Sequence, residues 1–200
     1  KNSKQLAIKF ISKFDKFIKN KINDNKLIIF SRHKKTSQNN GIFLGQKSNP
    51  GILDKKIPLE FKHIKIDYLI SSPARRCIET ARLIYKNKNI LSTDKLKEID
   101  YGKAEKFTLI NLKKKYPQIV KMWSKGKDPK FPNGESTSDV FKRLSKFLKS
   151  DLRFDKLKLK KNILILTHNV VLRCLIGSKF GIKMKDWFKI NINYFDILEF

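Results

Sequence analysis

Cysteines, acidic residues and long apolar runs are all scarce in this chain of 200 residues. The two cysteines, Cys77 and Cys174, cannot build a disulfide framework and lack the spacing of metal ligands, so we expect a reducing, cytoplasmic location. No apolar run approaches the ~20 residues of a membrane-spanning helix, and no secretory signal pattern is visible. These shortages argue against a disulfide-rich secreted domain and against a helical membrane protein.

The shortage of acidic residues gives the chain its charge. Asp and Glu number 18 against 46 Lys and Arg, which leaves a formal net charge of +28. Such a charge is typical of nucleic-acid-binding proteins. Lysine is spread along the whole chain, however, and only seven of the cations are arginine, so we expect no specific nucleic-acid partner. Where lysine is the default cation, a retained arginine is a candidate for bidentate recognition of an anion.

Two short apolar runs each end in a histidine. Residues 27–30 are typical of a strand buried on both faces, and Arg32 and His33 follow them. Residues 162–167 form a second such run, and His168 follows it. Because ligands bind outside the carboxyl ends of the strands in open α/β sheets, these side chains are candidate site residues.

The remaining pattern alternates strands with helices. We predict strands at 67–71 and 91–96, helices at 74–85, 106–116, 137–148 and 170–180, and an edge strand in the last residues. This alternation predicts a layered α/β fold in one domain, residues 26–200.

Residues 3–22 have the pattern of an amphipathic helix, with lysines on the face opposite the apolar one. We therefore expect residues 1–25 to form an N-terminal helical extension. The helix either packs on the domain surface or serves as a basic helix for a membrane surface or a partner.

Five motifs follow one another between residues 32 and 168. They are Arg32-His33-Lys34-Lys35-Thr36, Ser71–Arg76 with Thr80-Ala81, Leu96-Lys97-Glu98 before Tyr101-Gly102, Pro132–Ser136, and Leu166-Thr167-His168. In this order they resemble the signature of the histidine phosphatase superfamily, branch 1, which has the phosphoglycerate mutase-like fold. The resemblance covers roughly residues 26–200. It implies a three-layer α/β/α sandwich with a mostly parallel central sheet.

The resemblance also implies roles for the cationic side chains. His33 would be the nucleophile that forms a phosphohistidine, with one ring nitrogen held by a hydrogen bond. Arg32, Arg76 and His168 would hold the phosphoryl oxygens, and Asn39 would lie near the phosphate. With these charges supplied by the protein, we expect neither a metal nor a cofactor.

Glu98 is implied as the general acid, which would protonate the leaving oxygen and then deprotonate the attacking water. Glu135 and Ser136 would line the pocket or cap the following helix. One position departs from the family, because Lys34 stands where the family has glycine. Its side chain either points away from the pocket or adds a cation to it.

Three functions remain open. We expect a metal-independent phosphatase that acts on a small phosphorylated metabolite. The alternative is a cofactor-dependent phosphoglycerate mutase, which shares the core residues but carries a longer insertion than the segment between Tyr101 and Gly134 here. A minor alternative is an inactive, basic binder of polyanions or nucleic acid. The sequence predicts no oligomeric state.

Overall fold

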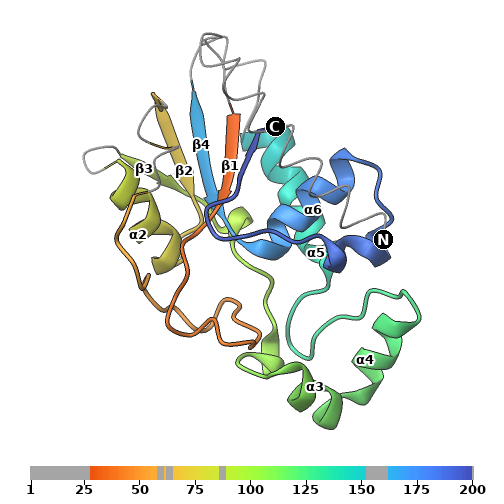
Figure 1. Ribbon diagram of the computed structural model, residues 1–200. Coiled ribbons are helices and arrows are strands. Elements are labelled where there is room, and N and C mark those ends of the chain that lie inside the picture. The colour runs from red at the N-terminus through yellow and green to blue at the C-terminus, as the bar shows by residue number, and fades with distance from the viewer. Residues whose placement is uncertain (1–27, 58–60, 62–64, 86–88, 152–161, 200) are drawn as a thin grey trace.

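The computed structural model describes residues 28–57, 61, 65–85, 89–151 and 162–199 (Figure 1). The predicted helix over 3–22, and with it the predicted extension 1–25, lies outside the described residues.

A five-stranded sheet carries the fold, in the order β3-β2-β4-β1-β5. The strands are β1 (Ile28–Arg32), β2 (Tyr68–Ser71), β3 (Ile90–Ser92), β4 (Ile163–Thr167) and β5 (Ile197–Glu199). All pairs are parallel except β1 with β5, which is antiparallel. The prediction of a mostly parallel sheet with a C-terminal edge strand is therefore confirmed.

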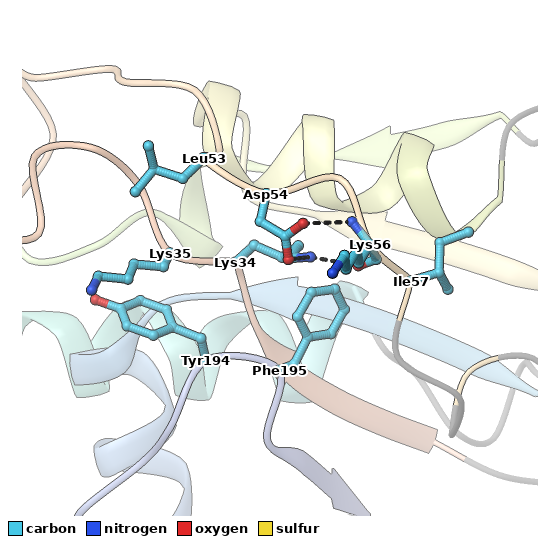
Figure 2. Close-up of a pocket in the computed structure, with 8 residues that line it drawn as sticks. All are labelled: Lys34, Lys35, Leu53, Asp54, Lys56, Ile57, Tyr194 and Phe195. Carbon is cyan, nitrogen blue, oxygen red and sulfur yellow. Dashed lines mark hydrogen bonds and ion pairs between the residues drawn. The ribbon is translucent and has the colours of Figure 1, made fainter.

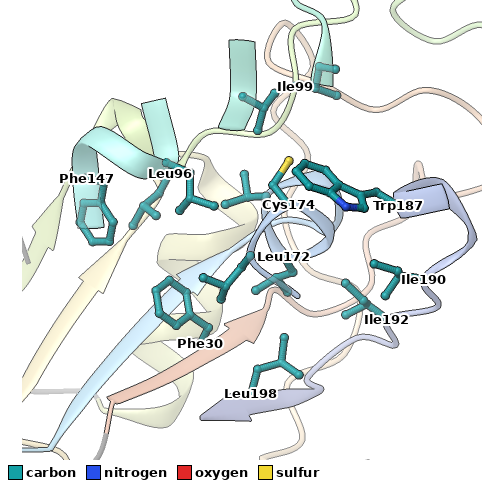
Figure 3. Close-up of a cluster of buried hydrophobic side chains, with 14 of the residues drawn as sticks. Phe30, Leu96, Ile99, Phe147, Leu172, Cys174, Trp187, Ile190, Ile192 and Leu198 are labelled. Carbon is teal, nitrogen blue, oxygen red and sulfur yellow. The ribbon is translucent and has the colours of Figure 1, made fainter. Parts of the chain in front are cut away.

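Helices cover both faces of this sheet (Figure 1). Helix α2 (Arg75–Ile84) lies on one face, and α5 (Thr137–Lys146) and α6 (Asn169–Lys179) lie on the other. Side chains alternate along a strand, so neighbouring residues of β1 enter different cores. Ile29 packs with Ala81 of α2, whereas Phe30 packs with Leu172 of α6 and the rest of the larger cluster (Figure 3). The two clusters produce the predicted three layers.

The strand predicted at 91–96 ends earlier than predicted. Strand β3 stops at Ser92, and Asp94–Leu96 form a 3₁₀ turn (η2) whose first residues are capped by the Thr93 side chain. The residues towards Glu98 therefore approach the sheet from a turn. The helix predicted over 106–116 forms over Leu109–Lys115, and Pro117 then opens a second helix, where its fixed φ and missing N–H are tolerated.

The two helices at this point are α3 (Leu109–Lys115) and α4 (Pro117–Ser124). They lie apart from the sheet (Figure 1). An aromatic cluster joins them to the domain: the ring centroids of Trp123 and Phe131 are 5.4 Å apart, and those of Tyr101 and Phe131 are 4.9 Å apart. Trp123 thus anchors α4 to the domain.

The remaining elements are short. They are η3 (Gly102–Ala104), a π-helical turn η4 (Phe147–Asp151) that prolongs α5, and η5 (Met184–Lys189). Both cysteines lie in helices, and both are buried and free. No helix in the described part of the chain is long and apolar enough to cross a membrane.

Candidate active site

His33 lies at the carboxyl edge of the sheet. Its backbone N–H donates to the Thr167 carbonyl, 3.1 Å away, so the residue continues the pairing of β1 with β4. The ring Nδ1 lies 2.6 Å from the Lys34 carbonyl oxygen. A carbonyl can only accept, so Nδ1 carries the proton and Nε2 is left with a free lone pair.

Burial keeps this ring neutral. The side chain is 3% exposed, and burial lowers the pKa of His33 well below its usual range. The positive charges of Arg76 and Arg32 lower it further, whereas the hydrogen bond to Lys34 opposes the shift. At neutral pH, His33 is therefore an uncharged imidazole with one available nitrogen.

His168 faces His33 across the sheet edge. The two ring centroids are 5.1 Å apart, and His168 is fully buried between β4 and α6. Its Nε2 forms a 2.8 Å hydrogen bond with the Ser72 hydroxyl. Burial, and then the charge of Arg76, lowers the pKa of His168 well below its usual range. The sequence pattern did not single out Ser72, although the serine belongs to the motif that follows β2.

The two candidate arginines are held by backbone carbonyls. Arg76, in the first turn of α2, is 1% exposed and donates to the carbonyls of Ser48 and Gly45 at 3.2 and 2.9 Å. Arg32 donates to the Ile192 carbonyl at 2.7 Å, and its guanidinium carbon lies 3.9 Å from the centroid of the Tyr194 ring.

Each of these guanidinium groups has one N–H donor that is not hydrogen-bonded to another described residue. The Nε atoms of Arg32 and Arg76 are buried and have no hydrogen-bond partner among the described residues. Buried polar groups are normally paired, because an unpaired donor costs free energy. An oxyanion placed between the arginines would satisfy these donors and balance the two charges.

Glu98 is buried, with 6% of its surface exposed. Its Oε1 accepts from the backbone N–H groups of Ile99 and Val170, at 3.0 and 3.2 Å. Burial raises the pKa of the Glu98 carboxyl, although these hydrogen bonds and the charges of Arg76 and Arg32 oppose the shift. A carboxyl with a raised pKa can hold a proton and deliver it to a leaving group.

Arg143 fixes the backbone that carries Glu98. It donates to the carbonyls of Lys95 and Glu98 at 2.8 and 3.0 Å, and it forms an ion pair with Glu135 at 2.9 Å. Ser136 caps α5 in a reciprocal pair with Asp139. Of the two roles left open for the Glu135-Ser136 motif, Ser136 thus takes the capping one, and Glu135 supports Arg143. Arg143 was not singled out from the sequence, although an arginine retained in a lysine-rich chain was a signal that pointed to it.

Asn39 has a local role in the structure. Its Oδ1 accepts from the backbone N–H and the hydroxyl of Thr36, at 2.9 and 2.7 Å. These bonds shape the loop directly after the nucleophile motif. The predicted contact of Asn39 with a phosphate stays a prediction.

Lys34, in the place of the family glycine, turns towards Asp54 rather than towards the two histidines. Its ammonium lies 2.7 Å from the Asp54 carboxylate and also donates to the Lys56 carbonyl (Figure 2). Its backbone N–H donates to the Thr80 hydroxyl at 3.0 Å. The lysine therefore fastens the segment around Asp54 next to the site.

The assembled side chains are suited to an anion with a leaving group. The structure brings together Arg32, Arg76, His33, His168 and Glu98, from β1, α2, the end of β4 and the loop after η2. Within the described ranges, no group of three or more His, Cys, Asp or Glu side chains is placed to hold a metal ion.

Comparison with known proteins places this arrangement in a family. A sequence profile of the histidine phosphatase superfamily, branch 1, matches residues 28–200. A curated phosphoglycerate mutase from Schizosaccharomyces pombe is 29% identical over 170 residues, which cover 78% of this chain and 80% of that protein. Phosphoserine phosphatase 1 from Hydrogenobacter thermophilus is 27% identical over 137 residues, or 66% of this chain and 64% of the relative.

A solved structure agrees in fold. The phosphoserine phosphatase from Entamoeba histolytica, in complex with 3-phosphoglyceric acid, has a TM-score of 0.70 at 22% identity, and the match covers 86% of this chain and 88% of that one. The profile match takes in every described residue and all five motifs. This chain belongs to the histidine phosphatase superfamily, branch 1.

Proposed function

We propose that the protein is a phosphatase that hydrolyses a small phosphomonoester through a phosphohistidine at His33, without a metal. The observation that carries the proposal is the state of His33: a buried, neutral ring whose Nδ1 is bound to the Lys34 carbonyl and whose Nε2 is free. Beside it, Arg32 and Arg76 each keep one unpaired buried donor. A neutral nucleophile between two such cations fits a dianionic phosphoryl group.

The reaction would take two steps. In the first, the Nε2 lone pair of His33 forms a bond to phosphorus while the bond to the substrate oxygen breaks, and protonated Glu98 gives its proton to that oxygen. Arg32, Arg76 and His168 hold the phosphoryl oxygens as charge is redistributed. In the second, the Glu98 carboxylate takes a proton from water, which attacks phosphorus and releases His33 and inorganic phosphate.

Labelling tests the intermediate. After brief mixing with a phosphorylated substrate carrying a radioactive phosphoryl group, wild type should hold label that is lost in acid and kept in base. His33→Ala should hold none, and Ser124→Ala, a change on exposed α4, should behave like wild type. Label that persists in His33→Ala would refute the assignment.

A mutase is the second candidate, favoured by the 29% identity to the phosphoglycerate mutase. A mutase must keep water from its phosphohistidine. Here a cavity lined partly by the exposed side chains of Lys35, Leu53 and Lys56 adjoins the site, which supports access for water and hence hydrolysis. Incubation with 3-phosphoglycerate and catalytic 2,3-bisphosphoglycerate separates the two. Release of phosphate supports the phosphatase, whereas rapid formation of 2-phosphoglycerate with negligible phosphate supports the mutase.

A further inference from the structure

A cavity of about 500 Å³ lies next to the candidate active site (Figure 2). Its walls come from the residues after β1, from the segment around Asp54 and from the turn before β5. Three lysines, one aspartate and four apolar or aromatic side chains line it. In the proposed reaction the cavity only admits water, and no side chain that lines it has a chemical role.

The cavity has an excess of positive charge. Its one carboxylate, on Asp54, is already bound by the Lys34 ammonium and by the backbone N–H of Lys56, at 2.7 and 2.8 Å. The Lys35 and Lys56 ammonium groups form no ion pair with a described residue. Lys56 still lies near enough to lower the pKa of Asp54. Of the three lysines that line the cavity, Lys35 is thus the one whose positive charge is least balanced by a carboxylate of a described residue.

Tyr194 lies next to both the cavity and His33. The Tyr194 ring lines the cavity, lies 5.9 Å from the His33 ring and stacks on the Arg32 guanidinium. In Figure 2, the Lys35 side chain extends towards Tyr194, and Ile57 lies at the opposite end of the cavity. If the phosphoryl group of a substrate binds at His33, the organic part of that substrate can therefore extend past Tyr194 towards Lys35.

The backbone of Lys35 is held in place. Its carbonyl accepts from the Leu53 N–H at 3.0 Å, next to an antiparallel bridge between Thr36 and Ile52. The ammonium therefore extends from a fixed point, although the side chain itself is exposed.

We propose that Lys35 is a specificity-determining residue, whose ammonium binds a second anionic group on the organic part of the phosphomonoester. That group is a carboxylate or a second phosphate, and the carbon skeleton between the two anions lies along Tyr194 and Leu53. The inference rests on the proposed function, because it takes His33 as the phosphoryl acceptor.

Three substrates that differ at one end test the proposal. Glycerol 3-phosphate has no second anion, 3-phosphoglycerate has a carboxylate there, and glycerol 1,3-bisphosphate has a phosphate. For wild type, Lys35→Gln, Lys35→Arg and the control Lys113→Gln on exposed α3, kcat/KM is measured for each. Lys35→Gln should lower the preference for an anion-bearing substrate over glycerol 3-phosphate about two- to fivefold, mainly through KM, as the loss of one exposed ion pair predicts.

Lys35→Arg should keep the preference, and Lys113→Gln should not change it. The larger loss, with the carboxylate or with the phosphate, identifies the anion that the cavity takes. A preference in Lys35→Gln that stays within about twofold of wild type for both substrates would overturn the proposal while leaving the phosphatase intact.

If wild type hydrolysed none of the three, the proposed function would fail. Equilibrium binding would then test separately whether the cavity binds an anion. Titration calorimetry with the bisphosphate and with 3-phosphoglycerate should then show weaker binding to Lys35→Gln than to Lys113→Gln. Equal binding to both variants would overturn the anion site as well.

Discussion

Replacement of Arg143 by methionine tests whether the Glu98 loop is held by this one guanidinium. The change removes two hydrogen bonds to the carbonyls of Lys95 and Glu98, and it leaves Glu135 without its ion pair. Hydrogen bonds from a charged donor contribute about 1.5–3 kcal/mol each. The side chains of Arg143 and Glu135 are 17% and 22% exposed, so water recovers part of this loss.

We therefore expect Arg143→Met to lower the free energy of unfolding by about 2–4 kcal/mol. For a domain of this size, the change corresponds to a fall in Tm of roughly 4–16 °C. Because the loop also positions Glu98, the proposed general acid, kcat should fall about ten- to a hundredfold, with a smaller change in KM.

Calorimetry and steady-state kinetics measure both effects, with Arg82→Met as the matched control at an exposed position of α2. A Tm for Arg143→Met equal to that of Arg82→Met would show that the Glu98 loop is stable without the guanidinium. A normal Tm with normal kcat would refute the whole account of Arg143.

Three further predictions concern the phosphoryl site and the charge. Arg76→Lys keeps the charge but loses the planar fork, so kcat/KM should fall about ten- to a hundredfold, and a value near wild type would mean that Arg76 is structural. Since the pKa of His33 is lowered and that of Glu98 raised, activity should fall in acid only well below the usual histidine range, as His33 gains a proton. It should also fall as pH rises through the raised pKa of Glu98 and this residue loses its proton, and Glu98→Gln should abolish this high-pH limb of the kcat/KM profile. DNA binding, measured by fluorescence anisotropy, should be weak and should collapse as salt rises to about 200 mM, and tight binding above that would favour the polyanion binder.

The sequence predicted the parts of the site that depend on strand ends. The apolar runs before His33 and His168 identify two buried strands, and a parallel sheet brings the carboxyl ends of such strands to one edge. Arg76 follows from the same reasoning, because it lies in the first turn of the helix after β2. The local sequence pattern is sufficient to predict a site residue when the strand or helix that carries the residue also determines its position.

Contacts between distant segments could not be predicted in this way. The carboxylate of Glu98 is placed by the Val170 N–H and its backbone by Arg143, and both lie far from it along the chain. Tyr194 reaches Arg32 only because β5 returns antiparallel beside β1. No periodicity in residues 190–200 encodes that stacking.

The hydrogen bond from Arg32 to the Ile192 carbonyl spans 160 positions of the sequence, and it has a consequence for the order of synthesis. The ribosome synthesises β1 and His33 long before it reaches residue 192, so the proposed nucleophile emerges before the carbonyl that holds the neighbouring Arg32 exists. Strand β1 also cannot pair until its parallel partner β4 has been synthesised, and contacts between residues so far apart in sequence form slowly. A nascent chain that stops before residue 190 would therefore contain every residue proposed for phosphoryl transfer, but it would lack the carbonyl that holds Arg32 in place.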